Sequence, residues 1–244
     1  MIGQDDESVT RQLRDKWCEI PATRQGRQYI SDLLQLSDRD LLGYWETCRI
    51  ETSTPEVRGW FQTAYKERLR GARLADIGPG VGVDGIWFAQ HGAHVTFVDI
   101  VADNLALLER LCTLKAISAE YYFVDDFFEY RFARPFDCFL CVGSLINAPF
   151  EFTQRQVRAL NRHLRIGGLV LMLGYPRERF VALGAKDGSE FGKITDGPRT
   201  PWAEWYDDDK VRELFGSTFR LEMSRNFGTD GIEFNWFELT KVAD

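Results

Sequence analysis

The feature that most constrains this chain is an alternation of apolar runs and helical segments between residues 72 and 175. The runs, which predict strands, are 72–78, 93–100, 119–126, 136–144 and 167–175. Segments of ten to fifteen residues at 83–92, 102–116 and 152–166 have helical composition. Strands that alternate with helices form right-handed crossovers, so a doubly wound parallel sheet is expected.

The flanking regions differ from this pattern. Helices are predicted at 9–17, 26–36, 38–50 and 54–70, with Ser37 or Asp38 as a helix cap and Thr54–Pro55 starting the last one. Residues 175–206 are expected to be irregular. A helix at 207–216 and two strands at 219–227 and 232–242, joined through Gly228–Gly231, complete the chain.

These elements give an α/β fold with a doubly wound seven-stranded sheet, mostly parallel, with an antiparallel C-terminal hairpin strand. We expect an N-terminal helical cap or lid at 1–70 and a Rossmann-like core at 71–244. A second lid, inserted at 175–206, is expected because a long irregular segment in a compact domain is usually functional.

Charge and cysteine usage narrow the partners. The formal net charge of -7 repels a phosphate backbone or an anionic membrane, so neither nucleic acid nor membrane is an expected partner. No secretory leader or bilayer-length apolar stretch is found, and the five cysteines are scattered. Cys138 and Cys141 lie in a strand-like run and are interpreted as buried thiols, not metal ligands. We expect a cytoplasmic monomer or homodimer.

A glycine-rich turn follows the first strand of the alternating region. Gly80, Gly82 and Gly85 match the dinucleotide pattern GxGxxG, whereas Asp76 with Gly78, Gly80 and Gly82 matches (D/E)xGxGxG. A dinucleotide places an anionic pyrophosphate at the helix start, which a carboxylate opposes. S-adenosylmethionine carries a sulfonium and an ammonium instead, so Asp76 favours that cofactor.

Acidic residues also end the next two strands. Asp99 can accept both ribose hydroxyls of an adenosine cofactor. Asp103 and Asn104 lie nearer the following helix and are expected to cap it in place of Asp99. At the third strand end, Asp126 with Phe127 is preferred over Asp125 as an adenine site.

Taken together, DIGPGVG, VTFVDI, VDDF, FDCFLCVGSL and LRIGGLVLML resemble the class I S-adenosylmethionine-dependent methyltransferases over residues 72–174. The resemblance implies methyl transfer from S-adenosylmethionine and a Rossmann-like fold whose last strand is antiparallel. The implied cofactor-binding residues are Asp76, Gly78, Pro79, Gly80, Gly82, Asp99, Ile100, Asp125, Asp126, Phe127, Val142 and Gly143.

One position departs from the family. Many relatives carry a histidine after the fourth strand, where this chain reads Ser144–Pro149, and its three histidines lie elsewhere. A histidine base is therefore not expected. The acceptor pocket is expected from the two lid regions, with Glu204, Tyr175 and Glu46 as catalytic candidates and no metal. The substrate-binding candidates are Tyr44, Arg49, Arg177, Trp202, Trp205 and Tyr206.

The expected acceptor is a small molecule such as a natural product, an amino-acid derivative or a sugar. A protein substrate stays open as an alternative. So does an NAD(P)-dependent oxidoreductase that uses Gly80, Gly82 and Gly85, and so does an inactive scaffold subunit that retains the fold.

Overall fold

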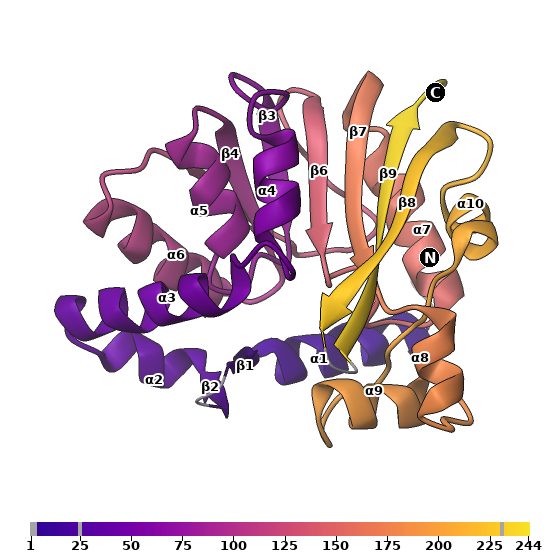
Figure 1. Cartoon of the computed structure of the whole chain (residues 1–244), viewed down its shortest axis with the longest axis horizontal. Helices are drawn as coiled ribbons and strands as arrows, with labels where there is room; N and C mark the ends of the chain where they lie inside the picture. Colours follow the sequence, from indigo (N-terminus) through magenta and orange to yellow (C-terminus); the bar gives the residue numbers. More distant parts are fainter. Residues whose placement is uncertain (1–3, 24–25, 230–231) are drawn as a thin grey trace. The chain divides into compact units, whose positions relative to one another are not determined.

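The computed structural model describes residues 4–23, 26–229 and 232–244. Two compact units are present: Trp17–Val124, and Met1–Lys16 together with Asp125–Asp244. The sheet has seven strands in the order β5-β4-β3-β6-β7-β9-β8, which confirms the predicted fold class (Figure 1). Whether residues 1–70 and 175–206 act as lids stays a prediction.

The first unit contains the β3-β4-β5 part of the sheet. β3 (Arg73–Ile77), β4 (His94–Asp99) and β5 (Glu120–Phe123) pair in parallel. The connecting helices are α5 (Val83–Gln90) and α6 (Ala102–Leu114). These strands and helices confirm the predicted alternation, because each lies within a segment whose sequence pattern indicated it.

The N-terminal elements of this unit are partly different from the prediction. They are β1 (Glu19–Thr23), β2 (Gly26–Tyr29), α2 (Ile30–Gln35), α3 (Asp38–Thr52) and α4 (Gly59–Tyr65). The helix expected to begin at residue 26 is wrong for its first turn, since β2 pairs antiparallel with β1 and Gly26 has a positive φ of 84°.

The two helix starts predicted here have different outcomes. Ser37 caps α3, because its hydroxyl accepts a hydrogen bond from the backbone amide of Asp40. The start at Thr54–Pro55 is wrong. The Thr54 carbonyl accepts from the amides of Val57 and Gly59 in a turn, and the helix begins only at Gly59.

The second unit contains the β6-β7-β9-β8 part of the sheet. β7 pairs parallel with β6, and β9 runs antiparallel to both β7 and β8. This confirms the antiparallel C-terminal hairpin, although Asp230 and Gly231 of its turn lie outside the described residues. Its elements are α1 (Gln4–Trp17), β6 (Phe136–Val142), α7 (Phe150–Asn161), β7 (Leu164–Gly174), α8 (Arg177–Ala182), α9 (Gly188–Asp196), α10 (Asp208–Phe215), β8 (Phe219–Thr229) and β9 (Ile232–Lys241).

Two predictions in this unit need correction. Residues 175–206 are not wholly irregular, because α8 and α9 form within them, with Asp187 capping α9 through the amide of Glu190. Helix α7 ends at Asn161 instead of residue 166, and β7 begins at Leu164, where it pairs with Phe136. The pairing of Leu164 with Phe136 of β6 therefore outweighs the helical composition of residues 162–166.

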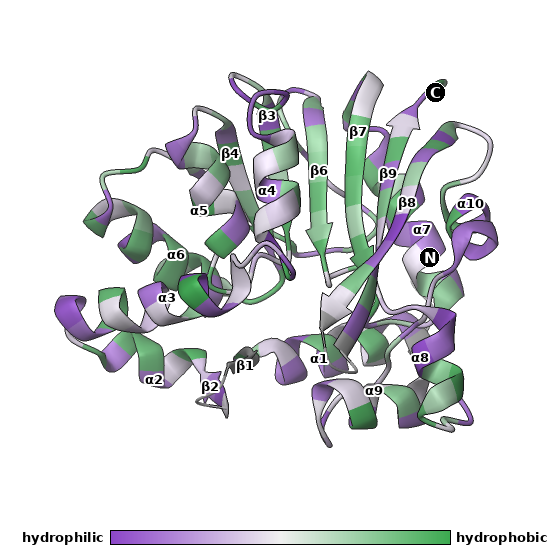
Figure 2. Ribbon diagram, in the orientation of Figure 1, coloured by the Kyte–Doolittle hydropathy of each residue, from purple (hydrophilic) through white to green (hydrophobic). Residues whose placement is uncertain are grey.

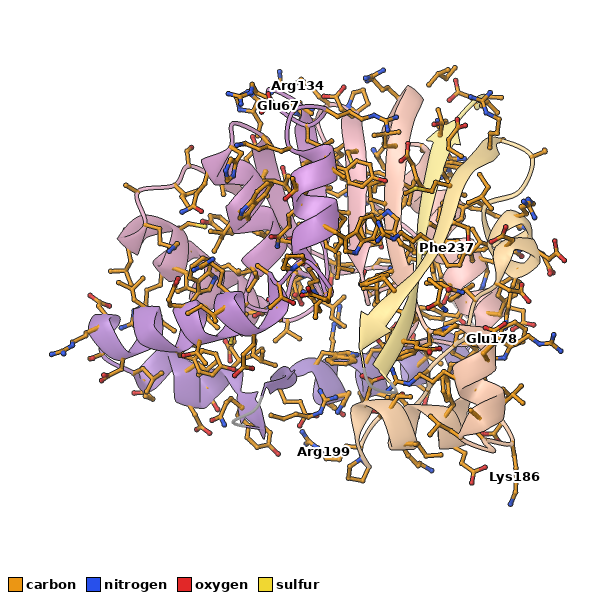
Figure 3. All side chains as sticks on the ribbon, viewed as in Figure 1. Glu67, Arg134, Glu178, Lys186, Arg199 and Phe237 are labelled. Atoms are coloured by element: carbon orange, nitrogen blue, oxygen red, sulfur yellow. The ribbon has the colours of Figure 1, made fainter. Side chains whose placement is uncertain are left out.

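The central strands supply the core. Figure 2 shows β6 and β7 coloured mainly hydrophobic beyond their first residues, as expected for strands covered on both faces. Phe237, labelled in Figure 3, is fully buried in β9, and Glu178 and Lys186 mark solvent-exposed positions. Cys138 and Cys141 are buried in β6, which confirms their interpretation as core thiols. Among the described helices, none combines the length and apolarity that crossing a membrane requires.

Lys241 should hold the junction between α7 and β7. Its ammonium, only 2% exposed, donates to the carbonyls of Asn161 and Leu164 at 3.0 and 2.9 Å. Lys241→Met leaves these carbonyls without that donor, so chemical denaturation should show a loss of roughly 1–3 kcal/mol in unfolding free energy. Arg220→Met on β8, which breaks only an exposed pair with Glu222, should cost less than about 1 kcal/mol. Equal losses would contradict this account.

Candidate functional site

The glycine turn lies between the end of β3 and the start of α5. Gly78, Gly80 and Gly82 all have positive φ, at 64°, 56° and 67°, which side chains rarely allow. A Cβ on Gly82 would also lie 2.5 Å from Leu108 Cδ2 of α6. The turn therefore has no side chain at three of its five positions, and at Gly82 it is packed against α6, as required where backbone amides must closely approach a ligand.

Asp76 lies beneath this turn, at 2% exposure. Its Oδ2 would be 2.4 Å from a Cβ on Gly85 and has no hydrogen-bond partner. Burial, reinforced by the Asp84 carboxylate, raises the pKa of Asp76 well above its usual value, while Arg58 and the Gly85 amide act in the opposite direction. The carboxyl group is directed at the first turn of α5, and direct contact with a cofactor cation stays a prediction.

Asp84 forms a buried network that the sequence analysis missed. Its carboxylate accepts from Arg58 Nη1 at 2.9 Å and from Gln62 Nε2 at 2.8 Å. Two acids, Asp76 and Asp84, are thus buried close together with one arginine beside them. The available signal was a lone acid in the otherwise apolar segment VDGIWFAQ directly after the turn.

Asp99 ends β4 and is nearly buried. Its Oδ1 accepts from the Val101 amide at 2.8 Å and its Oδ2 from Asn104 Nδ2 at 2.6 Å. The expectation that Asp103 and Asn104 would cap α6 is wrong, because Val101 is the N-cap residue and Asn104 donates to Asp99. Burial raises the pKa of Asp99 to about 6, although these hydrogen bonds favour the charged form.

The remaining residues that were predicted to contact adenosine follow β4 and β5 in the sequence. Ile100 is half-buried after β4. In the other unit, Phe127 is buried edge-on against Phe152, with 5.3 Å between ring centroids. Asp126 accepts from the Phe128 amide at 2.7 Å.

Asp125 and Asp126 have different surroundings. Asp126 lines an open cavity of about 420 Å³ on α7, whereas Asp125 is exposed and its carbonyl accepts from Arg14 at 2.8 Å. Val142 ends β6, and Gly143 after it has a φ of 75° with open space at the position of a Cβ. Because residue 143 is a glycine, no side chain of its own covers the backbone at this strand end.

The candidates on α3 form a charged cluster. Glu46 accepts from Arg49 Nε at 2.9 Å and from its Nη2 at 2.5 Å, and these hydrogen bonds lower the pKa of Glu46. Tyr44 and Trp45 are buried. A carboxylate paired in this way is a poor base, so Glu46 is the weakest of the three catalytic candidates.

Tyr175 follows β7 and is buried together with Asp196. Its hydroxyl donates to Asp196 at 3.1 Å, and burial with that carboxylate raises the pKa of Tyr175. Tyr175 therefore keeps its proton at neutral pH. Asp196, which the sequence analysis did not single out, also accepts at its carbonyl from the buried Lys16 of α1 at 2.8 Å.

Glu204 is also held on both oxygens. Lys210 donates to its Oε1 at 2.6 Å, and the Trp202 indole donates to its Oε2 at 3.1 Å. Lys210 lies 4.0 Å from the ring centroid of Trp205, and Arg177 lies 5.6 Å from it on the same measure. Glu204 is thus a fixed, ion-paired carboxylate.

Tyr206 and the loop after β6 complete this cluster. Tyr206 is fully buried, and its hydroxyl donates to the Leu145 carbonyl at 3.1 Å, so it belongs to the core and its proposed contact with substrate is disfavoured. Ser144 Oγ and Asn147 Nδ2 are buried without a hydrogen-bond partner. No sequence motif marked these two atoms.

The part of the chain that contains the glycine turn is similar to a known protein family. A family model described as a methyltransferase domain matches residues 74–168. No curated protein matches the chain.

Solved structures resemble the fold at low sequence identity. Magnesium protoporphyrin IX methyltransferase (ChlM) of Synechocystis PCC 6803 with bound SAM is 15% identical, covering 96% of this chain and 97% of that one, with a TM-score of 0.59. The N-methyltransferase NodS of Bradyrhizobium japonicum WM9, in complex with S-adenosyl-L-homocysteine, is 12% identical over 75% and 87%, with a TM-score of 0.56. A SAM-dependent methyltransferase of Methanosarcina mazei is 17% identical over 72% and 94%, with a TM-score of 0.60.

Gly85→Ala should disrupt the packing under the turn. The new Cβ would lie 2.4 Å from Asp76 Oδ2 and 2.6 Å from Phe97 Cε1, so unfolding free energy should fall by roughly 1–3 kcal/mol in denaturant titration. Gly43→Ala on α3 is the matched control, because a Cβ there meets nothing within 4 Å, and it should gain up to about 1 kcal/mol. A neutral Gly85→Ala would show that the Asp76 packing is unimportant.

Asp99 should make stability depend on pH. Its pKa is about 6 in the folded protein against an ordinary value of 3.8, so the folded state binds a proton that the unfolded state releases. Unfolding free energy should therefore fall as pH rises from about 4 to about 6, by roughly 3 kcal/mol from this group.

The matched variant is Asp99→Asn, which should show a flatter stability curve across the same pH window. Asp76 is present in both proteins, so the difference between the two curves isolates Asp99. Parallel curves from pH 4 to 6 would contradict the assignment of this proton to Asp99.

Proposed function

We propose that this chain, a class I S-adenosylmethionine-dependent methyltransferase by its domain and its fold, methylates a small-molecule acceptor. The observation that carries the proposal is the glycine turn of Gly78, Gly80 and Gly82, followed by the Asp99 carboxylate at the next strand end. The similar fold of ChlM, whose name gives magnesium protoporphyrin IX as its acceptor, supports the acceptor class. The net charge of -7 further favours it over nucleic acid.

The third glycine of the dinucleotide pattern, Gly85, is no evidence for a dinucleotide cofactor. Gly85 is required by packing, since a Cβ would collide with Asp76 and Phe97. Packing alone therefore explains why residue 85 is a glycine, without a bound pyrophosphate. Two buried acids, Asp76 and Asp84, at the start of α5 also make that helix end unfavourable for a diphosphate.

The residues present fit the cofactor. The backbone amides of Gly80 and Val81 can donate to its methionine carboxylate, whereas those of Gly78 and Gly82 already donate to the carbonyls of Val98 and Pro79. The Asp99 oxygens can accept from ribose hydroxyls in addition to their present donors. In this proposal Asp126 and the backbone at Phe127 bind adenine, and Val142 and Gly143 are further cofactor-binding positions. The unpartnered Asp76 oxygen is a buried acceptor of the kind that a bound ligand or water satisfies.

When bound, S-adenosylmethionine supplies a methyl group on a sulfonium that already has a good leaving group. The protein then has to orient the acceptor and exclude water. Tyr175, as a protonated phenol hydrogen-bonded to Asp196, can donate to an acceptor oxygen or accept from it. Glu204, fixed by Lys210 and Trp202, can orient a polar acceptor group, with Trp205 as a flat apolar wall.

Calorimetry provides the first test. S-adenosyl-L-homocysteine should bind the wild type with micromolar or tighter affinity, and Asp99→Ala should weaken binding at least tenfold, since two ribose hydrogen bonds are lost. NADH should give no heat. Tight binding of NADH without binding of S-adenosyl-L-homocysteine would overturn the proposal.

The acceptor class needs a second experiment. The enzyme with methyl-labelled donor should label compounds in a panel of small phenols, amines, carboxylates and sugars. It should label neither RNA nor a mixture of denatured proteins. Label found only in protein would instead establish the protein-substrate alternative.

A further inference from the structure

Helix α3, whose residues were expected to cover the acceptor, contacts the glycine turn directly. The indole N–H of Trp45 donates to the carbonyl of Val81, with 3.0 Å between Nε1 and the oxygen. Val81 stands between Gly80 and Gly82, and both Trp45 and Val81 are buried. A side chain from the N-terminal region therefore fixes the orientation of one peptide group in the middle of the turn.

Helix α4 and the residue before it contact the start of the helix that follows the turn. Arg58, directly before the helix, and Gln62 within it both donate to Asp84, in the first turn of α5. Asp84 follows the turn by two residues and is 4% exposed. The segment of α3 and α4 thus contacts both the turn and the helix start that follows it.

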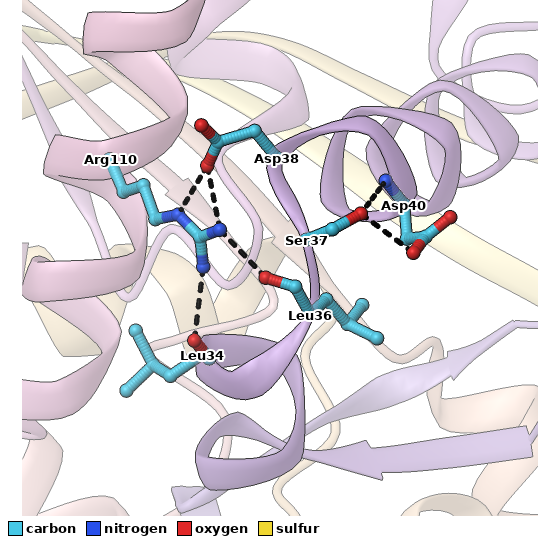
Figure 4. Close-up of polar contacts among 6 residues, drawn as sticks. All are labelled: Leu34, Leu36, Ser37, Asp38, Asp40 and Arg110. Carbon is cyan, nitrogen blue, oxygen red and sulfur yellow. Dashed lines mark hydrogen bonds and ion pairs between the residues drawn. The ribbon is translucent and has the colours of Figure 1, made fainter.

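Helix α3 is itself held rigidly within the unit. Arg110 of α6 donates to Asp38 and to the carbonyls of Leu34 and Leu36, at 2.6, 3.0 and 2.7 Å (Figure 4). Lys115, which follows α6, lies 3.7 Å from the ring centroid of Trp45. The indole is therefore positioned by α6 while its N–H is directed at Val81.

The glycine turn needs contacts from neighbouring elements to hold one conformation. Three of the five residues from Gly78 to Gly82 are glycines with positive φ, which are the most flexible residues in the unfolded chain and carry no side chain that could fix them. Backbone amides bind a ligand well only when held in place beforehand. The order in this turn must therefore come from its neighbours.

We propose that α3 and α4 are part of the cofactor site, with Trp45 and Arg58 as positioning residues that hold the glycine turn in its binding conformation. The proposal rests on the function proposed above, and it changes the role expected for this part of residues 1–70. In this role the segment acts directly on cofactor affinity.

Trp45→Phe tests the hydrogen bond, because it keeps an aromatic ring and removes the N–H. S-adenosyl-L-homocysteine should bind this variant about tenfold more weakly in calorimetry, the effect of losing roughly one buried hydrogen bond. Trp87→Phe is the matched control, since this indole lies on α5 and stacks on His91 with 3.9 Å between centroids. The control should bind within about twofold of wild type.

Hydrogen exchange gives a readout without any ligand. Amides of Gly78 and of residues 80–82 should exchange faster in Trp45→Phe than in wild type, while amides of β4 keep their protection. A purely structural role would instead raise exchange throughout the unit. Arg58→Gln, at a partly exposed side chain, should show the same pattern around Asp84 and serves as the second variant if Trp45→Phe does not fold.

The outcomes separate the two proposals. If wild type fails to bind S-adenosyl-L-homocysteine, the proposed function fails, and exchange of residues 78–82 still tests the positioning role. If wild type binds it and neither affinity nor local exchange changes in Trp45→Phe and Arg58→Gln, the positioning role is overturned and the proposed function stands.

Discussion

The structure of the first unit depends on how a turn with glycine at three of its five positions is kept in one conformation. Below it lie Phe97 of β4 and Leu108 of α6, which leave no room for a Cβ at Gly82. Trp45 holds the Val81 carbonyl from α3. The sheet supplies the strand end, but helices distant in sequence supply the order that a ligand-binding turn requires.

Electrostatics adds a second constraint at the same place. Asp76 and Asp84 are both buried, and desolvation raises the pKa of Asp76 well above normal. Arg58 and Gln62 satisfy Asp84, which leaves Asp76 with an unpartnered oxygen. Asp76 lies under the turn, where its carboxyl group contributes to the packing and the electric field of the turn, and its direct contact with a cofactor cation stays a prediction.

The groups proposed for the acceptor side are held differently. Tyr175 with Asp196, and Glu204 with Lys210 and Trp202, are polar pairs buried at or near the ends of strands and tied to their own partners. None of these groups is a free base. Such fixed groups suit a reaction in which the protein mainly orients the acceptor, because the leaving group is already activated in the donor.

The sequence by itself determined the alternation of strands and helices, the C-terminal hairpin and the turn from Asp76 to Gly82, because periodicity and glycine placement are local properties of the chain. Only the tertiary structure decided that Tyr206 is core, that Trp45 contacts the turn and that Arg58 contacts the helix after it. These facts depend on contacts between residues 36 or 26 positions apart, or on burial, which no local pattern encodes. The β1-β2 hairpin and the helices α8 and α9 escaped prediction because short elements rely on pairing and packing more than on their own propensity.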